Sequence, residues 1–509
     1  MKINRRHFLL GSAAAVTLAG CKTARTGLRP LKPGEKRNLA MIGCGFQART
    51  ALVSQFLDPN LAPNVRIVAA CDCDKTRAAA LAGQVNNAYK EKVCKAYTDF
   101  REVLADPSID MVCIGTPDHW HAYISVEAMK HGKDVYCEKP MTWSIAEAKA
   151  VIEAQEKYGR VFQTGSMQRS WREFRDAVSL VRGGLIGDVM FVDANYGRNG
   201  DKHGGPSHPV RFWDEPKNAA REGAPNTDVD WEMWLGPAKR RPYSDALSPR
   251  GAHRFYPMFW RFDDDLASGY NGDWGAHHLD IAQWGIGEDK GGPFRIIRSD
   301  EPCSENPFHG GRRQFGMKML FKKPYGTLEL YHGPFGIEST VWGTVFYGTK
   351  GIVAVNRGKI AVWLGTGAVK PTKEIRLQIE KCSFMPEKIV ASSVGVDYGT
   401  DAMVKKDDKL SDVLDKIEKT YAAEIKKAGI YRSENQVKNF CECVETREPT
   451  ISPAETGGRS GVLCLLCNMS YQYDTGFDWD PVKMEFANGT GKGIALGREG
   501  CCNGWKIEV

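Results

Sequence analysis

Strand-like apolar runs alternate with amphipathic helical stretches between Asn38 and about Thr164, and this alternation constrains the fold more than any other feature. Such an order is typical of a doubly wound parallel sheet with right-handed crossovers. We therefore predict a Rossmann-type domain over residues 38–165. The expected strands are Leu39–Ile42, Val65–Cys71, Met111–Gly115, Asp134–Cys137 and Val161–Thr164, with helical stretches such as Tyr123–His131 and Ser144–Tyr158 between them.

The first expected strand runs into Gly43-Cys-Gly45-Phe-Gln-Ala48, a G-x-G-x-x-A dinucleotide fingerprint. Gly43 permits a tight turn, Gly45 lets the backbone approach a pyrophosphate, and Ala48 lets the following helix pack closely. Asp72, at the end of the second strand, is placed to accept hydrogen bonds from an adenosine ribose. Its carboxylate would repel a 2′-phosphate, and neither Cys73 nor Asp74 offers an arginine. The pattern favours NAD over NADP.

Glu138-Lys139-Pro140 directly follows another expected strand. Ligands of open α/β sheets bind at the carboxyl ends of the strands, and proline makes the turn rigid. Lys139 is therefore predicted to present its ammonium to a ligand, and a solvated surface lysine is the alternative. One helix earlier lies Thr116-Pro-Asp-His-Trp-His121. We interpret its two histidines as pocket lining rather than a metal pair, because no third ligand of matching spacing is found.

After residue 165 the pattern changes, because strand-like runs follow one another directly. They predict a second, α+β domain over residues 166–485, with a large, open, mostly antiparallel sheet packed against helices on one face. Residues 198–262 form an irregular insertion and residues 486–509 a tail. The helices Ser433–Thr446 and Pro453–Tyr473 are expected to return to the first domain. The expected strands are Val189–Asn195, Met317–Lys322, Thr327–His332, Thr344–Tyr347, Ile352–Val355 and Ile360–Leu364.

The chemistry of the second domain is expected at Gly272-Asp273-Trp274-Gly-Ala-His277-His278-Leu-Asp280. Asp273 and His277 are four residues apart, so they share one face of a helix. A histidine backed by a carboxylate suits removal of a proton from an alcohol. His278 and Asp280 are interpreted as structural. Trp260, Arg261, Trp231 and Trp234 could contact a sugar, and buried packing explains the tryptophans equally well.

Taken in order, these motifs resemble the Gfo/Idh/MocA oxidoreductase family, and the likeness covers roughly residues 38–485. The segments Trp231–Pro237, Gly348–Gly351 and Phe477–Pro481 are similar to long exported members. The resemblance implies that Lys139 polarises a substrate hydroxyl, that His277 is the general base and that Asp273 is its partner. It implies a cofactor site made of Gly43, Gly45, Phe46, Gln47, Asp72, Thr116, Pro117, His119, His121, Glu138, Lys139 and Gln168, with no metal.

The charge of the chain is concentrated at its N-terminus. Of the formal net charge of +7, residues 1–38 hold nine Lys/Arg and one acidic residue, a balance of +8 that leaves −1 for the rest. Nucleic-acid binding thereby loses its main support. Arg5-Arg6-His-Phe-Leu9 and the apolar run after it predict a twin-arginine signal peptide over residues 1–21. Leu18-Ala-Gly-Cys21 resembles a lipobox, so Cys21 is expected to be lipidated at the cell envelope or in the periplasm. Residues 22–37 are a flexible linker.

The fifteen cysteines are expected to pack in the core rather than to form a disulfide framework. Cys44, Cys71, Cys113 and Cys137 lie at strand ends, where cysteine behaves as a small apolar residue. Cys464 and Cys467 lie in an apolar helical run without a second pair that could complete a zinc site. A partner for Cys501-Cys502 is not apparent from the sequence.

The predicted function is NAD-dependent hydride transfer at a hydroxyl-bearing carbon of a sugar or polyol, with the cofactor tightly bound after export in a folded state. A second reading is a glycosidase or lyase that oxidises C3 transiently and eliminates. The residues Trp274-Gly-Ala-His277 depart from the Tyr-Pro-Thr-His of that branch, which favours simple oxidoreduction. A third reading is a lipid-anchored carbohydrate-binding protein without activity. A homodimer or homotetramer is expected, because an exposed sheet commonly buries itself against another copy.

Overall fold

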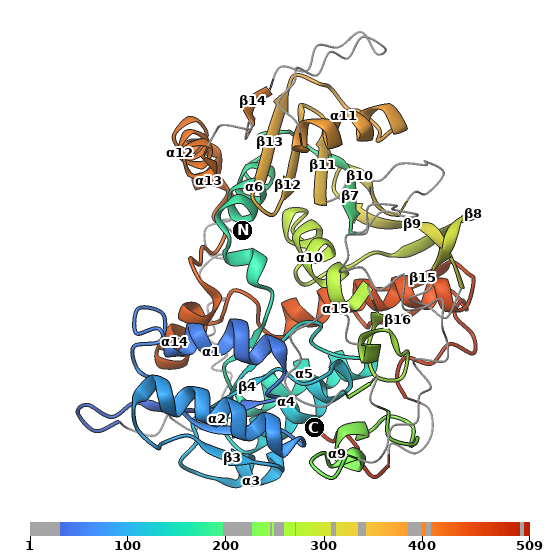
Figure 1. Cartoon of the computed structure of the whole chain (residues 1–509). Helices are drawn as coiled ribbons and strands as arrows, with labels where there is room; N and C mark the ends of the chain where they lie inside the picture. Colours follow the sequence, from blue (N-terminus) through green and yellow to red (C-terminus); the bar gives the residue numbers. More distant parts are fainter. Residues whose placement is uncertain are drawn as a thin grey trace, which may run out of the picture.

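The computed structural model describes residues 31–196, 226–244, 247–248, 259–269, 271–306, 312–333, 343–384, 400–403, 409–498 and 503–509. The predicted signal peptide with Cys21, most of the linker, much of the insertion and Cys501-Cys502 lie outside these residues. The described chain contains two β-sheets, one in the lower and one in the upper part of the view in Figure 1.

The first sheet is parallel throughout and has the predicted Rossmann architecture. Its strand order is β3-β2-β1-β4-β5-β6. The strands are β1 (Arg37–Ile42), β2 (Val65–Cys71), β3 (Lys95–Tyr97), β4 (Met111–Ile114), β5 (Asp134–Cys137) and β6 (Phe162–Thr164), and the helices around them are α1 (Val53–Leu57), α2 (Lys75–Tyr89), α3 (Phe100–Ala105), α4 (Asp118–Lys130) and α5 (Ile145–Tyr158). All five predicted strands are confirmed. Only the edge strand β3, three residues long, escaped the sequence pattern.

The second sheet is mixed and mostly antiparallel, as predicted, with the order β14-β13-β12-β11-β7-β10-β9-β8-β15-β16. Only the central pair β7–β10 is parallel. The strands are β7 (Val189–Asn195), β8 (Arg295–Asn306), β9 (Arg312–Lys323), β10 (Gly326–His332), β11 (Gly343–Gly348), β12 (Gly351–Asn356), β13 (Lys359–Leu364), β14 (Thr400–Met403), β15 (Phe477–Asp480) and β16 (Glu485–Phe486). Strand β8 was not predicted, because its register shifts around Pro302 break the alternation of apolar and polar residues.

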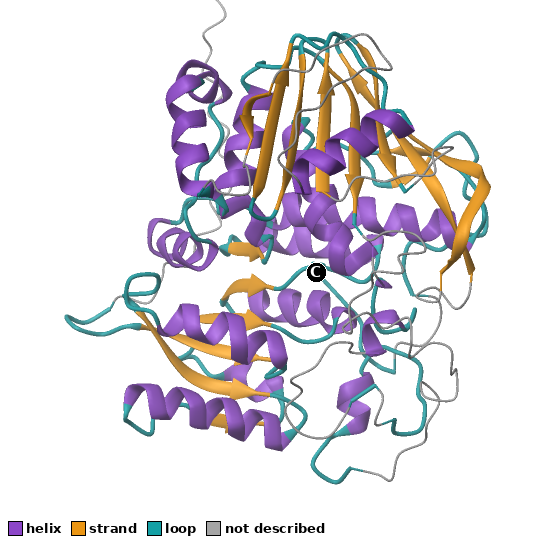
Figure 2. Cartoon of the chain, turned by 45° about the horizontal axis from the view of Figure 1, so that its top comes forward, coloured by secondary structure: helices purple, strands orange, loops and turns teal. Residues whose placement is uncertain are grey.

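Helices cover both faces of this second sheet, which corrects the expectation of one covered face (Figure 2). On one face lie α6 (Arg172–Arg182), α10 (Ala276–Gly285) and α15 (Ala454–Gln472). On the other lies α11 (Lys373–Phe384), whose Ile375 and Ile379 pack on the sheet. The guanidinium of Arg376 anchors α11 through an ion pair of 2.5 Å with the fully buried Asp193 of β7. The sheet face that was expected to favour a homo-oligomer is thus partly covered within the chain itself.

The C-terminal part of the chain packs against the Rossmann domain. Helix α14 (Gln436–Thr446) shares a core cluster with side chains of β1, and its Phe440 contacts Tyr136 with ring centroids 5.8 Å apart. Helix α15 lies against α5. The remaining helices α12 (Leu410–Thr420) and α13 (Ala422–Ala428) flank α6. Within the described residues, none of the helices has the length and hydropathy that crossing a bilayer requires.

The segment predicted as a tail also packs back on the first domain. Trp505 lies in an aromatic cluster with Trp120 and Tyr123 of α4, with ring centroids 4.8 Å and 5.2 Å from theirs. The chain end, marked C in Figure 1, accordingly lies beside α4 and α9 (Trp231–Leu235). A cluster of this kind buries enough aromatic surface to hold the segment in place. It was not predicted because residues 486–509 show no periodicity.

The cysteine prediction is confirmed for the described positions. Cys44, Cys71, Cys113 and Cys137 are buried at the strand ends of the first sheet and carry free thiols. Cys464 and Cys467 are buried on α15 and are also free. They contribute to the core as small apolar side chains.

Candidate active site

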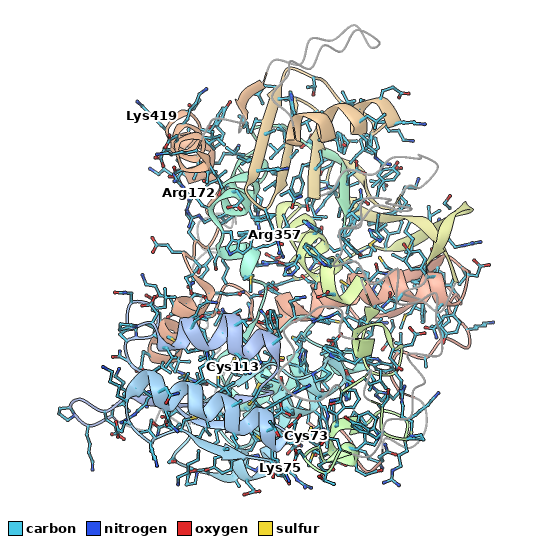
Figure 3. All side chains as sticks on the ribbon, in the orientation of Figure 1. Cys73, Lys75, Cys113, Arg172, Arg357 and Lys419 are labelled. Atoms are coloured by element: carbon cyan, nitrogen blue, oxygen red, sulfur yellow. The ribbon has the colours of Figure 1, made fainter. Side chains whose placement is uncertain are left out.

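One cavity of about 640 Å³ runs along the carboxyl ends of the parallel strands and continues between the two domains. Cys73, next to Asp72, lines one end of it, and Arg357 of the β12–β13 turn lines it from the second domain. Figure 3 labels both residues and shows them well separated, on the lower and the upper part of the molecule. A cavity at this position in an open α/β sheet is where a dinucleotide and its substrate are expected.

The glycine loop is built for a close approach of the backbone. Gly43 has a φ of +88°, and a Cβ there would lie 2.6 Å from backbone atoms of Gly115 and Thr116, so only glycine fits. A Cβ on Gly45, in contrast, would meet nothing within 4 Å, since this residue borders the cavity. The backbone amides after Gly45 begin a helical segment with a π-helical turn (Ala48–Leu52) that continues into α1. This loop fits a pyrophosphate group.

Asp72 lies at the predicted ribose end of the cavity. Its carboxylate accepts hydrogen bonds from the backbone amides of Cys44 (2.8 Å) and Asp74 (2.9 Å), so it fixes the glycine loop relative to the end of β2. Carboxylate oxygens have lone pairs left for ribose hydroxyls. Burial raises the pKa of Asp72. The amide bonds and nearby Arg77 act in the opposite direction.

Arg77 changes the argument about the cofactor's phosphate. Asp74 caps α2 by accepting from the amides of Thr76 and Arg77. This cap brings the Arg77 side chain into the cavity, 3.4 Å from the Asp74 carboxylate. The sequence near Asp72 offers only Cys73 and Asp74, and nothing in it showed that Arg77 lines the cavity. A cation near the ribose is therefore available, although the Asp74 carboxylate lies beside it, and Asp72 still opposes a 2′-phosphate.

The described part of the insertion is fixed beside this end of the cavity, and its Met233, Trp234 and Leu247 line the cavity. The amide of Asp230 donates to the oxygen of Cys73 (2.9 Å), and the amide of Lys75 donates to the oxygen of Asp228 (3.0 Å). The C-terminal segment holds this part of the insertion, because Asn503 donates through its side-chain amide to the oxygens of Gly236 (2.9 Å) and Ala238 (2.6 Å). Residues 228–238, called the roof below, are thus fastened beside the predicted ribose site by the segment after β2 and by the C-terminal segment.

The middle of the cavity contains most of the other predicted cofactor residues. Thr116, Pro117, Glu138, Phe46 and Gln47 all line it. Gln47 donates to the Glu138 carboxylate over 3.4 Å. Burial raises the pKa of Glu138.

The two predicted histidines differ in position. The ring nitrogens of His121 lie 2.7 Å and 2.8 Å from the backbone oxygens of Pro140 and Thr116, and this ring lines the cavity. The ring nitrogens of His119 contact the backbone oxygens of Leu266 (3.1 Å) and Trp234 (3.0 Å) behind the cavity wall. Burial lowers the pKa of His119 to about 4. His119 therefore holds Leu266 and Trp234 in the wall of the cavity and does not itself line it.

Lys139 reaches across the boundary between the domains to Asp273. Its Nζ donates to Oδ1 of Asp273 (2.6 Å) and to the backbone oxygen of the same residue (2.8 Å). Nη1 of Arg261 donates to the same Oδ1 over 2.8 Å. Since an ammonium has three donors, one of those on Lys139 remains for a ligand oxygen. A surface position for Lys139 is excluded, because its side chain is only 12% exposed.

His277 lines the cavity one helical turn after Asp273, but the predicted hydrogen bond between them is not formed. Asp273 is turned to Lys139 and Arg261, while Nδ1 of His277 is buried and has no hydrogen-bond partner among the described residues. Burial, and then the positive charges of Lys139 and Arg357, hold the pKa of His277 well below 6.5. The ring is therefore neutral at physiological pH, the state that a general base requires.

Trp274 and Gln168 hold Arg357 in place on the second-domain side of the cavity. The guanidinium of Arg357 lies 4.6 Å from the ring centroid of Trp274 and 5.3 Å from that of Trp171. Its Nε donates to Oε1 of Gln168 (3.0 Å). Gln168, predicted to bind the cofactor, does not line the cavity and instead positions Arg357. Arg357 had no sequence signal, because it lies in a turn far from every motif.

Two further predicted residues are placed away from the cavity. Asp280 binds the guanidinium of buried Arg169 (2.7 Å) inside the second domain. His278 is buried between the rings of Tyr196 and Trp274. Both positions agree with a structural role.

Comparison with known proteins identifies the family. Residues 37–166 match the NAD-binding Rossmann fold of the oxidoreductase family, and residues 204–315 match its C-terminal alpha/beta domain. The chain belongs to the Gfo/Idh/MocA oxidoreductase family. Its N-terminal domain is thus an NAD-binding Rossmann domain, as the glycine loop and Asp72 predicted.

Similar curated proteins include inositol 2-dehydrogenase of Salmonella typhimurium, 30% identical over 161 residues, and scyllo-inositol 2-dehydrogenase (NAD(+)) of Bacillus subtilis, 33% identical over 129 residues. These matches span 31% and 25% of this chain, and 44% and 36% of those relatives' own length.

Solved structures share the fold over most of the chain. The WlbA dehydrogenase of Bordetella pertussis, in complex with NADH and UDP-GlcNAcA, is 14% identical with a TM-score of 0.54, and the match covers 89% of this chain and 99% of that one. Aldose-aldose oxidoreductase of Caulobacter crescentus is 18% identical with a TM-score of 0.50, and the match covers 87% and 100%.

Proposed function

We propose that this chain is an NAD-dependent oxidoreductase that acts on a hydroxyl-bearing carbon of a carbohydrate or polyol. The observation that carries the proposal is that Lys139, the neutral His277 and the glycine loop line one cavity. The relatives named as inositol dehydrogenases support the substrate class. NAD, when bound, supplies the hydride acceptor.

The two domains contribute different groups to the reaction. The remaining donor of Lys139 binds the substrate oxygen and stabilises the negative charge that develops there. His277 accepts the hydroxyl proton, which its lowered pKa allows at neutral pH. In this proposal Asp273 positions Lys139, to which it is hydrogen-bonded, and it acts on His277 only through its charge.

A tightly held cofactor is part of the proposal. The roof beside the ribose end supports it, because the 228–230 strip pairs with residues 73–75 and the C-terminal segment fastens residues 236–238. We expect these contacts to open before a bound dinucleotide leaves, which would slow its dissociation. Export in a folded state would then carry the cofactor along.

We further propose that the protein is exported by the twin-arginine route and anchored through a lipid on Cys21, in the periplasm or cell envelope. The support is the order of Arg5-Arg6, an apolar run and Leu-Ala-Gly-Cys21 in the sequence. Arg5→Lys/Arg6→Lys is expected to retain the precursor in the cytoplasm, and Cys21→Ser to abolish labelling by a radioactive fatty acid. Unchanged fractionation of both variants would contradict this part. A homodimer or homotetramer, proposed on the extent of the second sheet, is tested by light scattering.

The experiment for the activity uses the mature protein purified without added nucleotide. Bound nucleotide is released by heat and identified by chromatography, and the intact protein is then mixed with sugars and polyols. We expect retained NAD and substrate-dependent reduced-nicotinamide absorbance. Release of an aglycone without net absorbance change would indicate the glycosidase or lyase alternative. Sugar binding without either signal would indicate a non-catalytic binding protein.

A further inference from the structure

Arg357 is a cation in the active-site cavity that has no carboxylate partner among the residues the structure describes. Three other arginines of the second domain that are buried or partly buried pair with acids: Arg169 with Asp280 at 2.7 Å, Arg376 with Asp193 at 2.5 Å and Arg261 with Asp273 at 2.8 Å. Arg357 makes no ion pair in the described part of the chain. Arg357 is partly buried, and removing a guanidinium from water without a counter-charge costs free energy, so an anion that arrives with a ligand would explain its position.

The surroundings of Arg357 hold it in place without neutralising it. The rings of Trp274 and Trp171 lie against its guanidinium, and Oε1 of Gln168 accepts a hydrogen bond from its Nε. Two acids act on it electrostatically, Asp273 and then Glu173. The Asp273 carboxylate already binds Lys139 and Arg261, and the Glu173 carboxylate accepts a hydrogen bond from the backbone amide of Gly358 at 2.9 Å. With Nε already used, the two terminal nitrogens of Arg357 remain as a pair of parallel donors. This pair matches the two oxygens of a carboxylate.

The cofactor does not account for this charge. A second cavity-lining arginine without an ion pair in the described chain, Arg49, lies in the first turn after the glycine loop, where nucleotide phosphates are expected. Arg357 instead lies in the β12–β13 turn of the second domain. Its guanidinium stacks on Trp274, whose ring is 5.9 Å from that of His277. The unpaired charge is thus on the substrate side, next to the proposed base.

We propose that the substrate is an acidic carbohydrate, a uronic or aldonic acid or its glycoside, whose carboxylate is bound by Arg357. This proposal rests on the proposed function for the site but makes a separate claim about what enters it. One carboxylate is favoured over a phosphate because Arg357 is a single cation, and the nearest others, Lys139 and Arg261, already bind Asp273. Arg357 is thereby a specificity-determining residue rather than a catalytic one.

The test compares matched pairs of ligands: glucuronate with glucose and with glucuronamide, and galacturonate with galactose. Glucose 6-phosphate is added as the phosphate probe. We measure kcat/KM by reduced-nicotinamide absorbance and, independently of turnover, binding to the NAD-loaded protein by calorimetry. We expect the acids to be favoured over their neutral partners by about 10- to 100-fold, the range for a hydrogen bond to a charged group. The amide should behave like the neutral sugar.

Variants then assign the preference to Arg357. Arg357→Gln is expected to lower kcat/KM and affinity for the acids about 10- to 100-fold while changing the neutral partners only a few-fold, and Arg357→Lys to retain part of the preference. The matched control is Arg295→Gln, since Arg295 forms an exposed ion pair with Asp478 at 2.5 Å at the edge of the sheet. Because the readout is a ratio between two ligands, a general loss of folded protein does not change it.

The outcomes separate this inference from the proposed function. Turnover of neutral sugars without preference for acids, unaffected by Arg357→Gln, would overturn the inference and leave the oxidoreductase intact. Acid binding that depends on Arg357, without turnover of any ligand, would support the inference and contradict the activity. A clear preference for glucose 6-phosphate over glucuronate would overturn the assignment of a carboxylate.

Discussion

Nζ of Lys139 lies 2.6 Å from Oδ1 of Asp273, so a residue from the Rossmann domain is positioned by a residue from the helix of the second domain. Both side chains are about nine-tenths buried, and an ion pair in such surroundings is sensitive to loss of either partner. The catalytic geometry therefore depends on how the two domains meet.

This contact predicts strong coupling between Lys139 and Asp273. Asp273→Ala and Lys139→Ala should each reduce kcat/KM, and the double variant should lose much less than the two effects combined, with a coupling of about 0.5–3 kcal/mol. The corresponding cycle of Asp273→Ala with His277→Ala should show weaker coupling, because no hydrogen bond joins that pair. Stronger coupling to His277 would restore the role that the sequence suggested for Asp273.

The pH dependence of the reaction should reflect the environment of His277. Its folded-state pKa lies well below 6.5, because of burial first and then Lys139 and Arg357. The base is thus neutral at and above pH 6.5, and kcat/KM should fall on acidification only below that value. In Arg357→Gln, assayed with a neutral sugar, the acid limb should move to higher pH, since one cation has been removed. An acid limb above pH 6.5 in the wild type would contradict this assignment of the base.

Asp72 should control the choice between NAD and NADP. Asp72→Ser removes the charge that repels a 2′-phosphate, while Arg77 remains in the same cavity. We expect the ratio of Kd values to shift toward NADP by about 10- to 100-fold, since like charges in contact cost several kcal/mol. The double variant Asp72→Ser/Arg77→Ala should lose most of the gain. Fluorescence titration of the nucleotide-free protein measures the ratio for the wild type and for both variants.

The parts of this site that the sequence revealed are those with local signals. Gly43, Asp72 and Lys139 each follow a strand of a parallel sheet, so the topology alone brings them to one edge. Asp273 and His277 both line this cavity, as their spacing of four residues suggested. The direction in which the Asp273 side chain points could not be predicted. Its partner depends on the cations that the tertiary fold places nearby, and those residues are far away in the sequence.

Long-range contacts account for most of what was missed. Arg357 lies in an ordinary strand turn, and only the packing of that turn against Trp171 and Trp274 makes it part of the site. Strand β8 and the C-terminal segment lack periodicity, so no local pattern marked them. Helix α11 covers the second face of the large sheet because Arg376 finds Asp193, a pairing across 183 positions of the chain.

The C-terminal segment should help to retain the cofactor. Trp505→Ala removes its ring from the cluster with Trp120 and Tyr123, which should cost about 1–3 kcal/mol, less than for a fully buried tryptophan. The roof fastened by Asn503 should loosen, so NAD should dissociate faster from a protein that still folds. Stopped-flow exchange against a fluorescent nucleotide analogue measures the rate. The exposed Tyr473 offers a control, since Tyr473→Ala lies outside this cluster. Equal rates for both variants would contradict the role of the roof.

The most direct test of the account is single-turnover absorbance of the NAD-loaded mature protein with a panel of neutral and acidic sugars and polyols. The wild type should generate reduced nicotinamide. Lys139→Ala should retain NAD but be about 10²- to 10⁴-fold slower, while Lys149→Ala, a change at an exposed lysine of α5, should match the wild type. If no carbohydrate reduces the bound NAD, or if Lys139→Ala reduces it as fast as the wild type, the central claim is wrong.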